Sequence, residues 1–132
     1  MELHELFAQD PNFSWLPADA QETLGDCFET KLETIPAGEH RANEGRIGYL
    51  LRGSGQVQRA DGTRRDVSAG SLFGIRAGGP QHHQRSEDTL TATEDCTVYW
   101  IGYDVLEFGC YRGCWFHTRF NMTLQTLLEK GM

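Results

Sequence analysis

Short apolar–polar alternations that end at glycine-rich turns constrain this fold more than any other feature of the sequence. Asp61-Gly62 is a strong signal for a two-residue hairpin, because both central residues of that turn need a positive φ. Further turns fall at Ala69-Gly70 and at 78–80. Strands at this near-regular spacing predict a mainly β fold, a jelly roll or double-stranded β-helix. The alternating segments are 32–35, 47–52, 56–58, 65–67, 89–93 and 98–103.

Helical spacing replaces the alternation at both ends of the chain. Leu3, Leu6 and Phe7 share one helical face near the start. Asp104 and Glu107 have the spacing of a capping box at the start of a short helix. A longer apolar face after residue 113 predicts an amphipathic helix, which must pack on the roll or on a second copy of the chain. That face consists of Phe116, Phe120, Leu124, Leu127 and Leu128, widened by Trp115 and Met122.

The length of 132 residues suffices for one domain. We expect a helical lead-in at 1–30, the roll at 31–103 and helices at 104–130. The net charge of −7 argues against direct binding to nucleic-acid phosphates. No apolar run is long enough to span a bilayer, and the start of the chain lacks the features of a signal peptide. We therefore expect a cytoplasmic protein without membrane contacts.

Several of these turn motifs occur in the order and spacing that is typical of one family. They are Ile35-Pro36-Ala37-Gly38-Glu39, Tyr49-Leu50-Leu51-Arg52-Gly53, Asp61-Gly62 and Ala69-Gly70-Ser71-Leu72-Phe73-Gly74. This pattern resembles the cyclic-nucleotide-binding-domain family. The segment 110–130 is similar to the long helix of Crp–Fnr regulators, which pairs two subunits in that family and leads into a winged helix-turn-helix.

The resemblance implies the N-terminal effector domain of a Crp–Fnr-type transcription regulator. Such a domain binds a small-molecule effector and forms a homodimer through its C-terminal helix, here through Phe116, Phe120, Leu124 and Leu127. DNA is then contacted only through a C-terminal domain that is not in this chain. We expect no enzymatic activity, because no Gly-x-Ser-x-Gly elbow, phosphate-binding loop or Gly-x-Gly-x-x-Gly motif follows a strand.

The ligand signature of that family is a phosphate-binding cassette, which opens with Phe-Gly-Glu and closes with an arginine. Here Phe73-Gly74 is followed by Ile75 at the glutamate position. Ser86 aligns with the arginine, and Arg85 lies one residue away. A buried phosphate needs a cation and N–H donors, so we expect an unknown effector other than cyclic AMP, or no ligand. The candidate ligand-binding residues are Phe73, Gly74, Ile75, Arg76, Ala77, Arg85 and Ser86.

Two other classes of protein remain open at this point. A cupin-type metal-binding protein or enzyme shares the roll, and His40, Glu44 and either His82 or His83 are its candidate ligands. The first cluster then has only one histidine, so the ligand set is short and no metal is expected. The other alternative is a ligand-free protein-interaction module, whose roll is filled by large apolar side chains.

The four cysteines give one further hypothesis. Cys110 and Cys114 share a helical face, and with His117 they could ligate zinc or part of an iron–sulfur cluster. Packed thiols are the simpler interpretation, since free cysteines usually behave as small buried hydrophobes. For the same reason Cys27 and Cys96 are expected to be buried.

Overall fold

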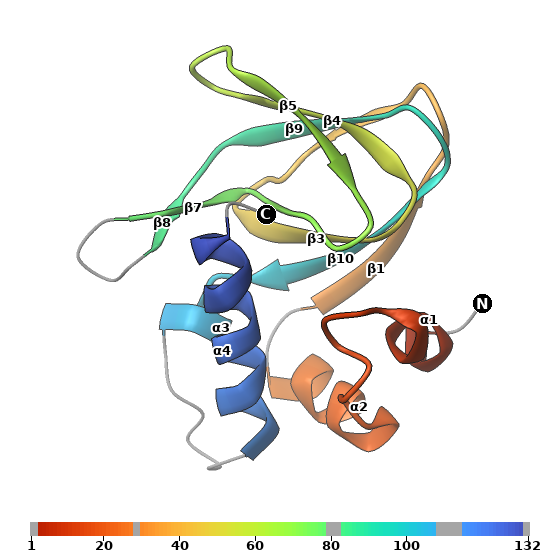
Figure 1. Ribbon diagram of the computed structural model, residues 1–132, viewed down its shortest axis with the longest axis vertical. Coiled ribbons are helices and arrows are strands. Elements are labelled where there is room, and N and C mark those ends of the chain that lie inside the picture. The colour runs from red at the N-terminus through yellow and green to blue at the C-terminus, as the bar shows by residue number, and fades with distance from the viewer. Residues whose placement is uncertain (1–2, 28–29, 79–82, 108–114, 131–132) are drawn as a thin grey trace.

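The computed structural model of the chain describes residues 3–27, 30–78, 83–107 and 115–130 (Figure 1). Its helices are α1 (Leu3–Gln9), α2 (Ala18–Cys27), α3 (Asp104–Glu107) and α4 (Trp115–Glu129). Its strands are β1 (Thr30–Ile35), β2 (His40–Ala42), β3 (Arg46–Arg52), β4 (Ser54–Arg59), β5 (Arg64–Ser68), β6 (Leu72–Phe73), β7 (Ile75–Ala77), β8 (His83–Arg85), β9 (Asp88–Ala92) and β10 (Cys96–Gly102).

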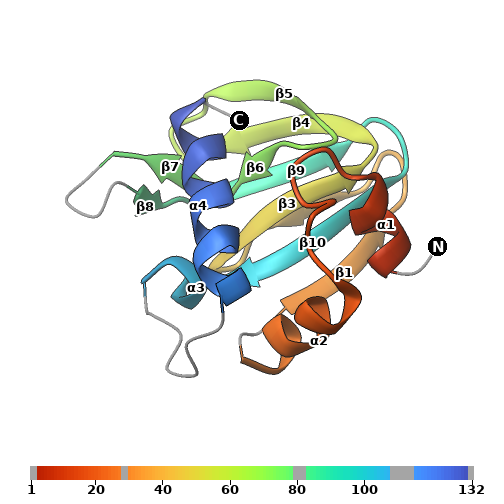
Figure 2. The ribbon, with the colours of Figure 1, turned by 60° about the horizontal axis from the view of Figure 1, so that its bottom comes forward.

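The strands form two four-stranded antiparallel sheets and a separate hairpin. The first sheet has the order β1-β10-β3-β6 and the second has the order β2-β9-β4-β5, while β7 pairs only with β8. Apart from the consecutive strands β4 and β5, neighbours within each sheet are distant in sequence, as expected for a roll. The predicted jelly-roll fold with helices at both ends is therefore confirmed, and Figure 2 shows the helices on one side of the first sheet.

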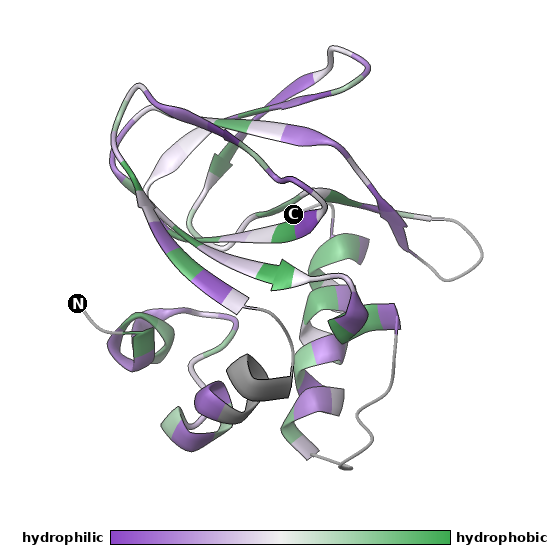
Figure 3. Ribbon diagram, turned by 180° about the vertical axis from the view of Figure 1, so that it is seen from behind, coloured by the Kyte–Doolittle hydropathy of each residue, from purple (hydrophilic) through white to green (hydrophobic). Residues whose placement is uncertain are grey.

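The two central strands of the first sheet are buried on both faces. Along β3, Ile47, Tyr49 and Leu51 face the helices, and Leu50 faces the inside of the roll. The sequence alternation predicted a strand with one buried face. Both faces are buried because the helices cover the side of the sheet that would otherwise meet water. By contrast, the edge strand β1 alternates between polar and apolar residues in Figure 3.

Aromatic side chains join the N-terminal segment, the sheet and α4 into one core. The ring of Phe13 lies 5.0 Å from Tyr49 and 4.8 Å from Phe120, between centroids. Phe7 packs edge-on against Tyr99 at 5.1 Å. Edge-to-face pairs of this kind add to the stabilisation that comes from burial alone. The ends of the chain are thus held together on the same face of the first sheet.

The helix face that was predicted to pair two subunits packs inside the chain itself. Phe120 and Leu124 are each 1% exposed and Leu127 is buried as well, while Phe116 packs against the edge of the same core. The assignment of Phe120, Leu124 and Leu127 as a pairing surface is therefore wrong, because they are covered within the chain, whereas Phe116 is partly exposed and its role in pairing stays a prediction. The prediction that Trp115 and Met122 widen this face is wrong too, because they are 60% and 63% exposed.

A second core fills the inside of the roll. Phe73 packs edge-on against Trp100, with 5.4 Å between ring centroids. The same ring lies over Gly48, where an added Cβ would come within 2.3 Å of it. Cys96 is buried here as predicted, and its thiol donates to the carbonyl of Ser54 at 3.2 Å. The interior of the roll leaves little room for a ligand between its two sheets.

The Asp61-Gly62 turn forms a hairpin, but its loop is longer than predicted. Gly62 alone takes a positive φ of 90°, and its N–H donates to the carbonyl of Arg59 at 2.9 Å. Arg59 also pairs with Thr63, so the loop has three residues and ends in a left-handed glycine. Asp61 keeps a negative φ because its carboxylate accepts from the N–H of Thr63 at 3.0 Å.

The contact between Gly48 and Phe73 gives a test of the inner core. The substitution Gly48→Ala should lower the free energy of unfolding by about 1–3 kcal/mol, because the new methyl group overpacks the core against the Phe73 ring. Urea unfolding monitored by tryptophan fluorescence measures the change. The double variant Gly48→Ala/Phe73→Leu should be less destabilised than the sum of the two single variants. Additive effects would contradict the contact.

Candidate ligand-binding site

The candidate cassette residues lie on the β7–β8 hairpin and directly beside it, where Ile75 pairs with Arg85 and the N–H of Ser86 donates to the carbonyl of Gly74 at 3.2 Å. Phe73 and Gly74 are buried, and Ile75 is 2% exposed in the core beneath α4. The apolar side chain at the family's glutamate position therefore joins β7 to the helix. Ala77 is exposed on the β7–β8 hairpin and lines no pocket that contains the other candidates. A ligand-binding role for these four residues has no support in the geometry of the two rim pockets and stays a prediction.

The other three candidates do meet at one pocket, at the rim of the roll. It has a volume of about 330 Å³ and lies between the β4–β5 turn and the β7–β8 hairpin. We call it the arginine pocket. Arg59 was missed by the sequence analysis, because only the register of the second sheet places it opposite Asp88. The pocket is lined by Arg59, Ala60, Asp61, Arg76, Gln84, Arg85, Ser86 and Glu87.

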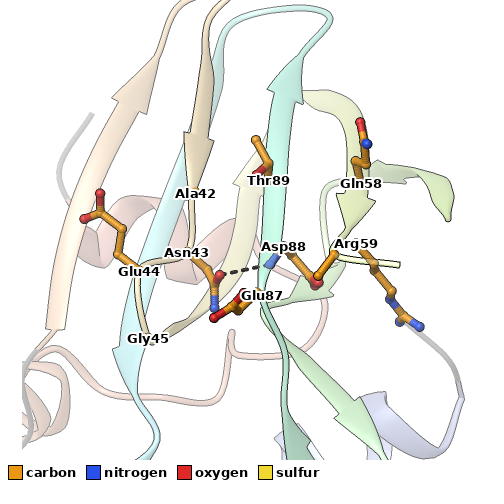
Figure 4. Close-up of a pocket in the computed structure, with 10 residues that line it drawn as sticks. Ala42, Asn43, Glu44, Gly45, Gln58, Arg59, Glu87, Asp88 and Thr89 are labelled. Atoms are coloured by element: carbon orange, nitrogen blue, oxygen red, sulfur yellow. Dashed lines mark hydrogen bonds between the residues drawn. The ribbon is translucent and has the colours of Figure 1, made fainter. Parts of the chain in front are cut away.

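A larger pocket adjoins the arginine pocket and shares Arg59, Ala60 and Glu87 with it. Its volume is about 570 Å³, and we call it the polar pocket (Figure 4). In Figure 4 the side chain of Arg59 extends away from Asn43 and Glu44. The remaining lining residues are Ala42, Asn43, Glu44, Gly45, Gln58, Asp88 and Thr89.

The buried amide of Asn43 holds the rim together. Its Nδ2 donates to the carbonyls of Arg46 and Ser86, both at 2.8 Å, and to the hydroxyl of Tyr103 at 3.2 Å. Its Oδ1 accepts from the N–H of Asp88 at 3.0 Å, the hydrogen bond drawn in Figure 4. One side chain thus connects the loop after β2 to the start of β9 and the end of β10.

Asp88 uses its carboxylate to fix the segment that precedes β9. Its Oδ2 accepts from the N–H of Gly74 at 2.6 Å, and its Oδ1 accepts from the hydroxyl of Ser86. Ser86 stands where the family's cassette has its arginine, and here its hydroxyl is engaged within the protein. Both oxygens of Asp88 are therefore occupied, and the rim around Gly74 is ordered without a ligand.

Arg85 connects the arginine pocket to α3. Its guanidinium donates to the carboxylate of Glu107, with 3.4 Å between Nε and Oε2, and lies 4.7 Å from the centre of the Tyr103 ring. His83 approaches the same carboxylate at 3.9 Å. Glu107 was predicted to take part in a capping box with Asp104. It turns to β8 instead, because two basic side chains face it there.

The helix α3 is in turn held by α4. The carbonyl of Val105 accepts from the side-chain amide of Asn121 at 3.2 Å, and the Nε2 atom of His117 lies 2.8 Å from it. His117 is buried and engaged in this contact. A continuous set of contacts therefore runs from Arg85 through Glu107 and α3 to the C-terminal helix.

Positive charge gathers around the arginine pocket. Burial lowers the pKa of Arg65, and the nearby charge of Arg59 lowers it further. Arg76 pairs with Asp61 across 3.1 Å. The pKa of Asp61 falls to about 2, first through the hydroxyl of Thr63 and then through its N–H and Arg76. Asp88 acts on the pKa of Arg65 in the opposite direction, and Arg65 does not line the pocket, so the positive charge at the pocket comes from Arg59, Arg76 and Arg85.

The residues that the structure describes do not assemble the cupin-type metal site. Within the described parts of the chain, no three histidine, cysteine or carboxylate side chains lie close enough to hold a metal ion. His40 lies on β2 and His83 on the separate hairpin, so the cupin-type set with Glu44 is not brought together. His82, Cys110 and Cys114 lie outside the described residues, as does the side chain of Cys27.

Among the helices that are described, none has both the length and the apolar character of a membrane span.

Three solved structures have folds similar to that of this chain. A Geobacter metallireducens GS-15 protein named for cyclic nucleotide binding is 17% identical, with a TM-score of 0.53 over 98% of this chain and 92% of its own. The N-terminal domain of a transcriptional regulator from Streptomyces coelicolor A3(2) is 16% identical, with a TM-score of 0.53 over 96% and 94%. A cAMP-binding acyltransferase from Mycobacterium smegmatis is 17% identical, with a TM-score of 0.53 over 76% of this chain and 33% of its own.

No protein-family model and no curated protein matches this sequence. The structural likeness nevertheless covers nearly the whole chain in two of the three cases. The chain therefore has the fold of cyclic-nucleotide-binding domains, as the sequence motifs predicted.

The ion pair between Arg85 and Glu107 predicts a specific pH dependence of stability. The hydrogen bond from Arg85 lowers the pKa of Glu107 below its ordinary value of 4.5. The folded chain then binds this proton less readily than the unfolded chain, so the pair stabilises the protein above that value. The stabilisation is lost as the pH falls through the lower folded pKa.

Urea unfolding of the wild type and of Glu107→Gln, between about pH 3 and about pH 6, measures this contribution. The difference in stability between the two proteins should shrink as the pH falls. Burial raises the pKa of Asp10, which changes stability in the opposite direction in both proteins and so cancels in the difference. A difference that is constant across this range would contradict the ion pair.

Proposed function

We propose that this chain is the effector-sensing and dimerisation domain of a Crp–Fnr-type transcription regulator, acting in the cytoplasm without catalysing a reaction. The likeness to the N-terminal domain of a transcriptional regulator supports this role. DNA is contacted through a separate C-terminal domain, since the net charge of −7 disfavours contact with phosphates by this domain itself. The effector is a small molecule that binds at the rim of the roll.

One observation carries this proposal, namely the link from Arg85 to Glu107. Arg85 lines a pocket and holds the carboxylate of α3, and α3 is bound to α4 through the carbonyl of Val105. A ligand that engages Arg85 changes the contacts of α3 and thereby those of the C-terminal helix. Such differential contacts between two states are what a ligand-driven switch requires.

Cyclic AMP in the family's binding mode does not fit this site. Ile75 is buried in the core beneath α4, and the hydroxyl of Ser86 is engaged by Asp88. The two positions that bind the ribose and the phosphate in the family are thus used here for packing and for holding the rim. The effector is accordingly a different compound.

A ligand-free protein-interaction module is the second candidate. The packing of Phe73 against Trp100 favours it, because these large side chains fill the interior of the roll. The arginine pocket lies outside this filled interior, at the rim. The two candidates therefore differ in whether the rim responds to a small molecule, and the experiment below separates them.

Amide hydrogen exchange tests the coupling between the rim and the helices. In Glu107→Gln the amides of α3 and of the first turns of α4 should exchange faster than in the wild type, because the side chain no longer pairs with Arg85. Glu87→Gln is the matched control, since Glu87 is exposed on the same rim. Compounds released from the purified protein by denaturation are identified by mass spectrometry, and adding the effector back should reproduce the faster exchange. Equal exchange in both variants and no response to any released compound would favour the interaction module.

The dimer is proposed to form through the exposed face of α4. Trp115 and Met122 are two turns apart on this face and are largely exposed, whereas Phe120 belongs to the core of the chain. Light scattering at high micromolar concentration should give the mass of a dimer. Met122→Lys should weaken association by at least about tenfold, because it places a charge within the interface. Thr91→Lys adds the same charge at an exposed position of β9 in the second sheet, away from α4, and serves as the control. A monomer at every concentration would contradict the pairing.

A further inference from the structure

Three arginines from three separate strands line the arginine pocket. Arg59 ends β4, Arg76 lies on β7 and Arg85 ends β8. Strand β4 belongs to the second sheet and β7 to the separate hairpin, so the tertiary fold brings these side chains to one place. Like charges repel each other, and an anion that pairs with several of them is bound strongly.

Two of these guanidiniums have donors that the protein leaves unused. Among the residues that the structure describes, no hydrogen bond or ion pair reaches the guanidinium of Arg59, although its Nε is buried. The buried Nε of Arg76 likewise has no partner within the same residues, while its Nη2 pairs with Asp61. Buried N–H groups are nearly always hydrogen-bonded in native proteins. The two donors therefore indicate an acceptor that comes from outside the chain.

The acidic groups around the pocket do not supply this acceptor. Asp61 accepts from Thr63 and Arg76, and Asp88 accepts from Gly74 and Ser86. Glu107 already accepts from Arg85. Glu87 is exposed at the edge of the pocket. The charges nearest to Arg59 are those of Arg65, which adds a second positive charge, and of Asp88 opposite it in the sheet, whose two oxygens already accept from Gly74 and Ser86.

The number of donors selects the kind of anion. A phosphate monoester carries up to two negative charges and three terminal oxygens, each of which can accept from a guanidinium. A carboxylate has two oxygens, and a cyclic phosphodiester has a single charge. The pocket volume of about 330 Å³ is at the small end for ligand sites. The polar pocket, which shares Arg59 and Glu87, gives room for the rest of the molecule beside Gln58 and Thr89.

We propose that the arginine pocket binds the phosphate group of a small phosphorylated metabolite through Arg59, Arg76 and Arg85. This inference rests on the proposed function and adds the chemical class of the effector. The phosphate competes with Glu107 for Arg85, so that binding weakens the contact between β8 and α3. Arg59 takes no part in that contact and serves only to bind the ligand.

Titration of the ¹⁵N-labelled protein with inorganic phosphate tests the site. The ionic strength is held constant with chloride, and the side-chain Nε–H signals of the arginines are followed by NMR. Saturable shifts are expected at Arg59, Arg76 and Arg85, and Arg59→Gln should weaken binding by at least about tenfold. Arg64→Gln is the matched control, because Arg64 is exposed on β5 and does not line the pocket. Shifts that rise without saturation, or equal affinities in both variants, would overturn the proposal.

Two further readouts separate the chemical class from the function. Cyclic AMP should bind more weakly than inorganic phosphate, and tighter binding would overturn the choice of a monoester. Saturable phosphate binding that leaves the amides of α4 unmoved supports the pocket but overturns the proposed switch. Faster exchange of α4 in Glu107→Gln without saturable phosphate binding supports the switch and overturns the phosphate site.

Discussion

The burial of β3 and β10 on both faces is the constraint on which the rest of the structure depends. Tyr49 and Tyr99 pack toward the helices, whereas Leu50 and Trp100 point into the roll. These two strands therefore lie between the two hydrophobic cores and contribute side chains to both of them. We expect a movement of the helices to displace β3 and β10 as well, because close-packed protein interiors transmit strain. We therefore expect movements of the roll and of the C-terminal helix to be coupled through these two strands.

Much of the fold could be predicted from the sequence because its signals are local. Alternation and glycine turns predicted β1, β3, β4, β5, β9 and β10, and the helical spacing of Phe120, Leu124 and Leu127 predicted α4. The strands β2, β6, β7 and β8 have only two or three residues each, too few for an alternation, and were not predicted. The packing partner of this apolar face depends on tertiary contacts, which local sequence patterns do not determine. The sequence analysis therefore could not decide between the roll and a second subunit. The structure places it on the chain's own sheet. Met122 was assigned to the wrong face because it lies at the edge of the apolar face of the helix, where a residue can be either buried or exposed.

The candidate site was harder to predict, because it is made by residues that meet only in three dimensions. Arg76 and Arg85 lie on one hairpin and were found through the family's cassette, whereas Arg59 depends on the register between β4 and β9. Ile75 stands at the position where the family's cassette has a glutamate. The structure gives a reason for an apolar residue there, because Ile75 packs beneath α4. Glu107 has the spacing of a capping box in the sequence, but in the structure its carboxylate pairs with Arg85 and lies near His83 instead.

In the proposed switch, the pairing of Arg85 with Glu107 would also set the sensitivity of the response to the effector. Glu107 is an acceptor tethered to the same molecule, so its effective concentration at Arg85 is far above that of a dissolved anion. An incoming ligand sees only the fraction of molecules in which Arg85 is free, and its apparent affinity falls in proportion. The threshold of the response is then fixed by the geometry of α3 as much as by the pocket. A substitution that moves Glu107 without touching the ligand would retune the concentration at which the protein responds.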